Sequence, residues 1–252
     1  MTDDRFLKPT AIIDSDHPAV IAYARAAAGD VADPRERAIR LYRAVRDDVV
    51  YDPYGLGLDV AGMRASTTLA NRRGWCVAKA ALLAACARAE GIPARLGFAD
   101  VRNHLSTEKL RAAMGTDLFV FHGNTELLLD GRWVKATPAF NKELCAKFGV
   151  PPLEWDGVHD SLLQAHDGAR RTFMEYVRDR GSYDDVPLDE ILAAFREHYP
   201  TMFPDAGGKK LDGDFGAEGA AERSTARRAD DPHGTSSAPR EAACTSEPRR
   251  IS

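Results

Sequence analysis

Cys76 and His122 carry the side chains in this sequence best suited to acyl-transfer chemistry. Cys76 precedes an Ala- and Leu-rich run from Val77 to Ala89, so it stands at or near the first turn of a predicted helix. Free N–H groups and the positive end of the helix dipole favour a thiolate over a thiol at such a position. His122 lies on a predicted strand and supplies the base that a nucleophilic cysteine needs. The two residues together predict a thiol nucleophile with a histidine partner.

The remaining cysteines lack such a setting. Cys86 lies in the middle of the same apolar run, and Cys145 follows the predicted hairpin, so both are interpreted as buried filler. Cys244 falls in a polar tail. Four cysteines without CxxC spacing do not make a disulfide scaffold in a chain of 252 residues. No phosphate-binding glycine motif opens a helix, and we expect neither a cofactor nor a metal.

The order of elements predicts an α+β fold. Two helices come first, from Pro18 to Gly29 and from Pro34 to Val49, followed by the cysteine helix, which ends at Gly91-Ile92-Pro93. A strand over 95–101, a short helical piece and two further strands joined at Asp130-Gly131 then predict an antiparallel sheet. Helices packed on an antiparallel sheet are typical of the α+β class.

The rest of the chain divides into a helical extension and a tail. Helices are predicted at about 159–180 and 188–198, within an extension that covers about 151–203. Residues 204–252 are rich in Gly, Ala, Ser, Pro and mixed charge, and too few large apolar side chains are present to offset the ordering entropy. We therefore expect one domain over 1–203 and a disordered tail over 204–252.

The segment from Thr67 to Pro138 resembles the transglutaminase-like superfamily, a papain-like group that includes transglutaminases, peptide N-glycanases and microbial cysteine proteases. The matching features are a Cys after Gly-x, a helix running into GIPAR, a His with a Glu four residues later, and a hairpin ending in Trp and Pro. They fall on Cys76, Gly91 to Arg95, His122, Glu126, Trp133 and Pro138. The resemblance implies a papain-like architecture and a Cys–His–Asp catalytic triad, with a core motif at about 67–138.

Two positions depart from the family pattern. The third catalytic residue, an Asp before the Pro, is Thr137 here, and the aromatic residue two places after the His is Asn124. A two-residue turn at 130–131 pairs 129 with 132 and therefore 124 with 137, so His122, Asn124 and Thr137 share one face. Thr137 is the expected third residue, and Asn124 is the alternative that orients the imidazole.

The resemblance implies that Cys76 attacks an amide carbonyl and forms a thioester, with the Cys76 backbone N–H in the oxyanion hole. We expect hydrolysis of a peptide or protein amide rather than cross-linking, with Trp75 lining the acyl pocket. A catalytically inactive binding module on the same fold and an acyltransferase of the arylamine N-acetyltransferase type are the alternatives. A reactive thiol would separate the enzymes from the binding module.

The composition of the chain indicates which kinds of partner and which cellular location to expect. The net charge is −4 and the basic residues are scattered, so we expect no nucleic-acid partner. The most apolar stretch, from Cys76 to Ala87, is too short to cross a bilayer. The acidic N-terminus, from Met1 to Arg5, lacks the apolar region of a secretory signal, so we expect a cytoplasmic protein.

Overall fold

The computed structural model describes residues 4–103, 106–161, 174–204 and 211–230. Its centre is an antiparallel four-stranded sheet in the order β5-β4-β3-β6. The strands are β3 (Ala94–Asn103), β4 (Leu118–Leu129), β5 (Arg132–Ala136) and β6 (Met174–Tyr183). A parallel pair, β1 (Val50–Tyr51) and β2 (Arg73–Gly74), lies apart from this sheet. The α+β prediction is confirmed.

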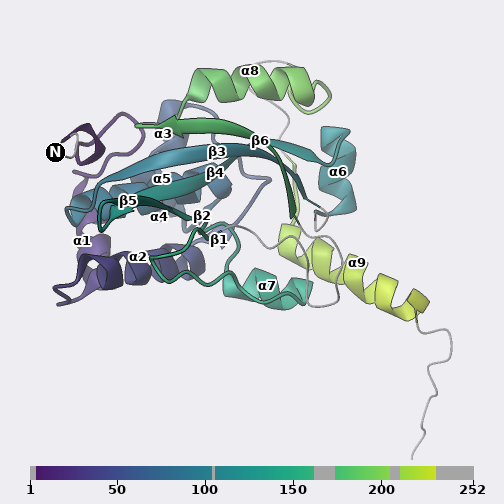
Figure 1. Cartoon of the computed structure of the whole chain (residues 1–252). Helices are drawn as coiled ribbons and strands as arrows, with labels where there is room; N and C mark the ends of the chain where they lie inside the picture. Colours follow the sequence, from purple (N-terminus) through teal and green to yellow (C-terminus); the bar gives the residue numbers. More distant parts are fainter. Residues whose placement is uncertain (1–3, 104–105, 162–173, 205–210, 231–252) are drawn as a thin grey trace, which may run out of the picture.

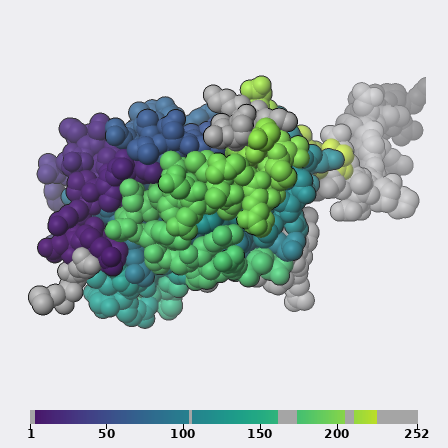
Figure 2. Space-filling model, turned by 90° about the horizontal axis from the view of Figure 1, so that it is seen from above, coloured from purple at the N-terminus to yellow at the C-terminus, as the bar shows by residue number. Residues whose placement is uncertain are grey.

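Helices lie on both sides of the sheet (Figure 1). One side carries α1 (Pro18–Ala28), α2 (Pro34–Asp48), α3 (Val60–Met63), α4 (Ala65–Asn71) and α5 (Cys76–Ala89). The other side carries α8 (Leu188–His198), which contacts β4, and the β6–α8 region covers the middle of the face in Figure 2. A short 3-10 helix, η1 (Asp4–Phe6), begins the described chain, while α6 (Glu108–Met114), α7 (Lys142–Phe148) and α9 (Phe215–Asp230) lie at one end.

Helix α5 is the centre of the hydrophobic core. Every residue from Cys76 to Arg88 is buried, as expected for a helix that is apolar on all sides. It packs on both β3 and β4 and against α1, α2 and α4. The predicted cysteine helix is confirmed, and its N-terminus is held in place by the core around it.

The β4–β5 hairpin has the predicted register, with Leu129 opposite Arg132 and Thr125 opposite Ala136. Asp130 and Gly131 have φ angles of 49° and 77°, the left-handed values that a type I′ turn requires at both positions. The two-residue turn therefore fixes which residues of the two strands face each other.

The predicted helix at 159–180 is wrong where the structure describes it. Residues 174–180 belong to strand β6, which pairs with β3 from Leu96 to Asn103, and residues 162–173 lie outside the described residues. Backbone groups of β3 need partners on both sides, and this tertiary requirement outweighs the local helical pattern. Tyr176 and Val177 suit a strand, and the charged residues beside them are common on a sheet edge. The predicted helix at 188–198 is confirmed as α8.

The structure also differs from the expected disordered tail, because residues 215–230 form α9. The buried Phe215 ring lies 5.7 Å from that of Tyr51, 5.8 Å from that of Tyr54 and 5.5 Å from that of Phe148, measured between ring centroids. One well-placed aromatic residue thus anchors a segment whose average composition predicted disorder. Residues 231–252, including Cys244, lie outside the described residues, and the domain boundary at 203 stays a prediction. Among the described helices, none has both the length and the apolar character needed to span a membrane.

Candidate active site

Cys76 is the first residue of α5, after Trp75 at the N-cap position, and no side chain caps this end of the helix. Burial of the thiol raises its pKa to about 11. Backbone N–H groups of Gly123, Val77 and Cys76 itself act against this shift by hydrogen bonding to the sulfur. The helix N-terminus therefore favours the thiolate, but the effect of burial on the pKa is larger.

His122 on β4 lines the same cavity as Cys76. Its side chain is buried, and Nε2 has no hydrogen-bond partner. Burial lowers the pKa of His122 to about 4. With a thiol pKa of about 11, the two groups stand at neutral pH as an uncharged thiol and an uncharged imidazole rather than as an ion pair.

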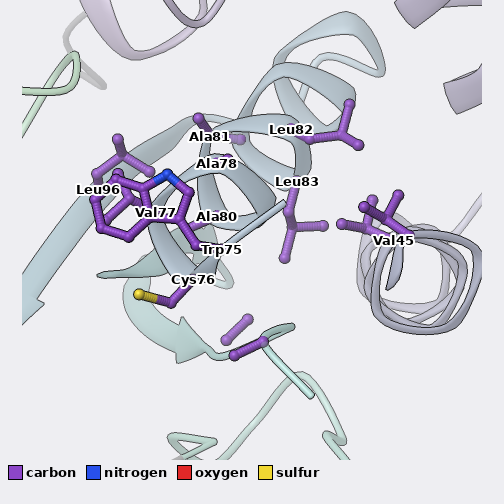
Figure 3. Close-up of a cluster of buried hydrophobic side chains, with 14 of the residues drawn as sticks. Val45, Trp75, Cys76, Val77, Ala78, Ala80, Ala81, Leu82, Leu83 and Leu96 are labelled. Carbon is purple, nitrogen blue, oxygen red and sulfur yellow. The ribbon is translucent and has the colours of Figure 1, made fainter. Parts of the chain in front are cut away.

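The cavity has a volume of about 50 Å³, room for a few water molecules. Its walls come from the loop after β1, from α6, from β4 and from α8 with the segment after it. The described lining residues are Tyr51, Pro53, Leu56, Trp75, Cys76, Leu110, Met114, Phe119, Val120, His122, Phe195, Tyr199, Met202 and Phe203. In Figure 3 the sulfur of Cys76 points away from Leu83 and Val45, which pack on the other side. The thiol thus faces out of the aliphatic core.

Strand β5 ends before it reaches the part of β4 that carries His122, and this part of β4 lies close to the first turn of α5. Ala136 is the last residue of β5 and pairs with Thr125, so among the described strands nothing pairs with residues 118–124 on that side. The backbone of Gly123 is among the groups that act to lower the pKa of the Cys76 thiol. A Cβ on Gly123 would lie 3.1 Å from Val77 Cα, so glycine permits the close approach of β4 to the first turn of α5.

An irregularity in β4 directly precedes His122. Phe121 has a φ of 55°, and the β3–β4 register shifts between Ala99 and Val101. The Phe121 N–H donates to Asp100 Oδ1 at 3.1 Å, and Asp100 in turn accepts two hydrogen bonds from Arg180 at 2.8 and 2.9 Å. The Arg180 guanidinium also lies 4.5 Å from the centroid of the Phe121 ring. A partly buried ion pair thus holds a strained residue next to the histidine.

The structure gives Thr137 and Asn124 other surroundings than His122. Thr137 Oγ1 donates to the Ser161 carbonyl at 2.7 Å. Asn124 lies over β3, where a Cβ on Gly97 would be 2.8 Å from Asn124 Oδ1. Its Oδ1 is buried and has no hydrogen-bond partner. The Thr137 hydroxyl is therefore engaged elsewhere, whereas the Asn124 oxygen is still available as an acceptor.

Trp75 lines the cavity, with its ring 5.8 Å from that of Phe195 between centroids, and its role in an acyl pocket stays a prediction. The sequence did not indicate that α8 would also reach the site. Tyr199 accepts the Val120 N–H at 2.6 Å and donates to the Leu118 carbonyl at 2.9 Å, which fastens the end of α8 to β4. Phe195, Tyr199 and Phe203 recur every four residues, and this helical spacing is the signal that marks the segment as a wall.

Comparison with known proteins shows which family the site region is similar to. Residues 21–138 match the family model of the transglutaminase-like superfamily. A protein from Cytophaga hutchinsonii described as a "putative cysteine protease" is 19% identical, with a TM-score of 0.42 over 71% of this chain and 53% of that one. A "putative protease" from Parabacteroides distasonis is 15% identical, with a TM-score of 0.35 over 54% of this chain and 25% of that one.

The chain thus spans about half of the first of these structures and a quarter of the second. None of the curated proteins compared with the sequence matches it. Within the described part of the chain, no group of three or more His, Cys, Asp or Glu side chains could hold a metal ion. The family match covers both Cys76 and His122, so the similarity to the transglutaminase-like superfamily includes the two residues of the candidate site.

Proposed function

We propose that this protein is a thiol enzyme that cleaves amide bonds through a thioester on Cys76. The observation that carries the proposal is that His122 Nε2, buried and without a partner, belongs to the same cavity as the Cys76 thiol. Buried polar atoms are nearly always paired in folded proteins, and exceptions concentrate where a ligand or a reaction completes the set. A cysteine at a helix N-terminus and a free imidazole are the groups that acyl transfer needs.

In the reaction, His122 acts as a general base toward a neutral thiol. The thiol proton passes to the imidazole as Sγ forms a bond with the amide carbonyl carbon. The C–N bond then breaks, and the amine leaves with the proton that His122 returns. Water, deprotonated by the same imidazole, hydrolyses the thioester to a carboxylic acid and restores the thiol.

Backbone donors supply the electrostatic part of the mechanism. The backbone N–H groups of Cys76, Val77 and Gly123 favour the thiolate over the thiol, so they stabilise negative charge on the sulfur. The Cys76 N–H is the candidate donor for the carbonyl oxygen. Neither Thr137 nor Asn124 carries a charge, so the imidazolium forms without a carboxylate partner and a moderate rate is expected.

Hydrolysis of peptide or protein amides is the proposed general activity, since water needs no acceptor site. One observation favours a second candidate, a binding module without catalysis: burial gives the Cys76 thiol a pKa of about 11, above that of an ordinary cysteine. The two candidates differ in whether His122 changes the reactivity of Cys76.

The deciding experiment is alkylation of Cys76 by iodoacetamide, followed by peptide mass spectrometry in the wild type and in His122→Ala. Base assistance by a neutral imidazole predicts at least about tenfold faster alkylation in the wild type, nearly constant between about pH 5 and pH 9. Cys86, buried mid-helix with a raised pKa, is the control within the same protein. Equal rates in both proteins, rising only as the thiol ionises, would overturn the enzyme and leave the binding module.

A further inference from the structure

The side chains that line the cavity beside Cys76 limit the kinds of substrate group that can bind there. Its described lining contains no Asp, Glu, Lys or Arg side chain. Apart from Cys76 and His122 it consists of aliphatic, aromatic and methionine side chains. Binding in such a pocket is favourable for an apolar group, because apolar surface leaves water. It is unfavourable for a charged group, because the charge must be desolvated.

The polar atoms at its walls are uncharged. Trp75 Nε1 is buried and has no hydrogen-bond partner, whereas the Tyr199 hydroxyl donates its proton to the Leu118 carbonyl and accepts the Val120 N–H. The thiol and the free imidazole are the reacting pair. A substrate group that enters beyond Cys76 therefore meets a surface that recognises shape and apolarity rather than charge.

We infer that Cys76 accepts a short, uncharged aliphatic acyl group, so that the substrates are amides of small aliphatic carboxylic acids. This inference rests on the proposed function and narrows it, because a volume of about 50 Å³ admits a chain of a few carbon atoms and no long side chain. Each methylene buried in the pocket increases turnover at low substrate roughly fourfold until the pocket is full.

Met114, the last residue of α6, is one of the apolar side chains that line the pocket. It is 5% exposed, and shortening it removes three heavy atoms from the wall without touching Cys76 or His122. Met63 on α3 is equally apolar and 0% exposed but does not line the cavity, which makes Met63→Ala the matched control for lost core packing. Met114→Ala is expected to admit longer chains, and Met63→Ala is not.

The first test measures the pocket without requiring catalysis. Alkyl methanethiosulfonates from methyl to hexyl, and the sulfonatoethyl and trimethylammonioethyl reagents, are applied to the full chain, and labelling of Cys76 is followed by mass spectrometry. After division by the rate of each reagent with a free small thiol, the ethyl and propyl reagents are expected to exceed both charged ones at least tenfold. The length limit should move upward in Met114→Ala but not in Met63→Ala. Equal normalised rates for charged and alkyl reagents would overturn the inference.

The second test uses substrates that differ in charge. Butyryl and succinyl p-nitroanilides have acyl chains of equal carbon number, and only succinyl ends in a carboxylate. Butyryl is expected to be cleaved at least tenfold faster, and faster than acetyl; equal cleavage would overturn the pocket assignment. If the alkyl reagents label Cys76 as described but His122→Ala alters neither alkylation nor cleavage, the proposed function fails and the apolar pocket stands.

Discussion

Two fully buried titratable groups lie near the first turns of α5 and differ in one respect. Lys79 is 0% exposed, and its Nζ donates to the Arg46 carbonyl at 2.9 Å and the Val49 carbonyl at 2.5 Å. His122 is also buried, but its Nε2 has no partner. Both pKa values are lowered by burial, to about 7 for Lys79 and about 4 for His122. Burial and a lowered pKa are therefore common to both groups, and their hydrogen-bond partners are what differs.

The Lys79 contact serves the fold. The carbonyls that accept from it stand at the end of α2, where the helix itself supplies no N–H partner. The lysine thus joins the C-terminal end of α2 to α5. His122 makes no comparable hydrogen bond through Nε2, and under the proposed function a substrate or a transferred proton supplies the missing partner.

The largest effect is expected for His122→Ala. Amide cleavage should fall about 10³-fold or more, because no other base in the described lining can take the thiol proton. Unfolding by urea should change by no more than about 1 kcal/mol, since an unpaired polar atom is removed along with some packing. A large loss of stability with intact cleavage would reverse the roles assigned to the two groups.

Lys79→Met is expected to show the opposite pattern. Two buried carbonyls lose their donor, so the free energy of unfolding should fall by about 2–4 kcal/mol. Cleavage per folded molecule should stay within about twofold of the wild type, because Lys79 does not line the cavity. Urea titration measures the free energy of unfolding, and a cleavage assay normalised to the concentration of folded protein measures the activity. Lys142→Met, at an exposed site, is the control. Wild-type stability in Lys79→Met would show that burial alone, and not its bonds, explains this lysine.

The dependence of stability on pH also separates the same two groups. The folded pKa of Lys79, about 7, lies below its ordinary 10.5, so the unfolded chain binds more protons in between and stability should rise with pH across that window. The folded pKa of His122, about 4, lies below its ordinary 6.5, so stability should fall as pH drops through that window. Differences between wild type and each variant in chemical denaturation at several pH values isolate the contributions. Lys79→Met should reduce the change of stability with pH only between about 7 and 10.5, and His122→Ala only between about 4 and 6.5. A variant that changes the pH dependence in the other window would contradict the assignment.

The sequence allowed much of this site to be predicted, and the reason is local. The apolar run after Cys76 and the Asp130-Gly131 turn each depend on neighbouring residues, so the helix, the hairpin and its register followed from pattern alone. Strand β6 and helix α9 depend instead on what distant parts of the chain leave unpaired or uncovered. Residues 174–180 have a helical pattern but form a strand because they pair with the edge of β3. Helix α9 is held by the packing of Phe215 against other aromatic rings.

The residues that line the cavity also divide into those that local sequence predicts and those that depend on distant parts of the chain. Cys76, His122 and Trp75 could be predicted from the sequence, but the walls contributed by α6 and α8 could not. The backbone strain at Phe121, with its support from Asp100 and Arg180, also appears only once β3, β4 and β6 are paired. Side chains that carry chemistry are thus easier to find in a sequence than those that shape the space around them.

The same criterion of satisfied or unsatisfied hydrogen bonds ranks the two residues that could orient the imidazole, and here the smallest effects are expected. Thr137 is satisfied like Lys79, through the Ser161 carbonyl, so Thr137→Val should cost about 1 kcal/mol of stability and leave cleavage within about twofold. Asn124 Oδ1 is buried and unpaired like His122 Nε2, so Asn124→Ala should lower kcat about tenfold by removing an acceptor for the imidazole N–H. Steady-state kinetics of both variants, with urea unfolding as the parallel measurement, decide between them. A larger loss of kcat in Thr137→Val would mean that its hydroxyl exchanges the Ser161 carbonyl for His122 when substrate binds, and that hydrogen bonds in the closed site do not predict those of the working one.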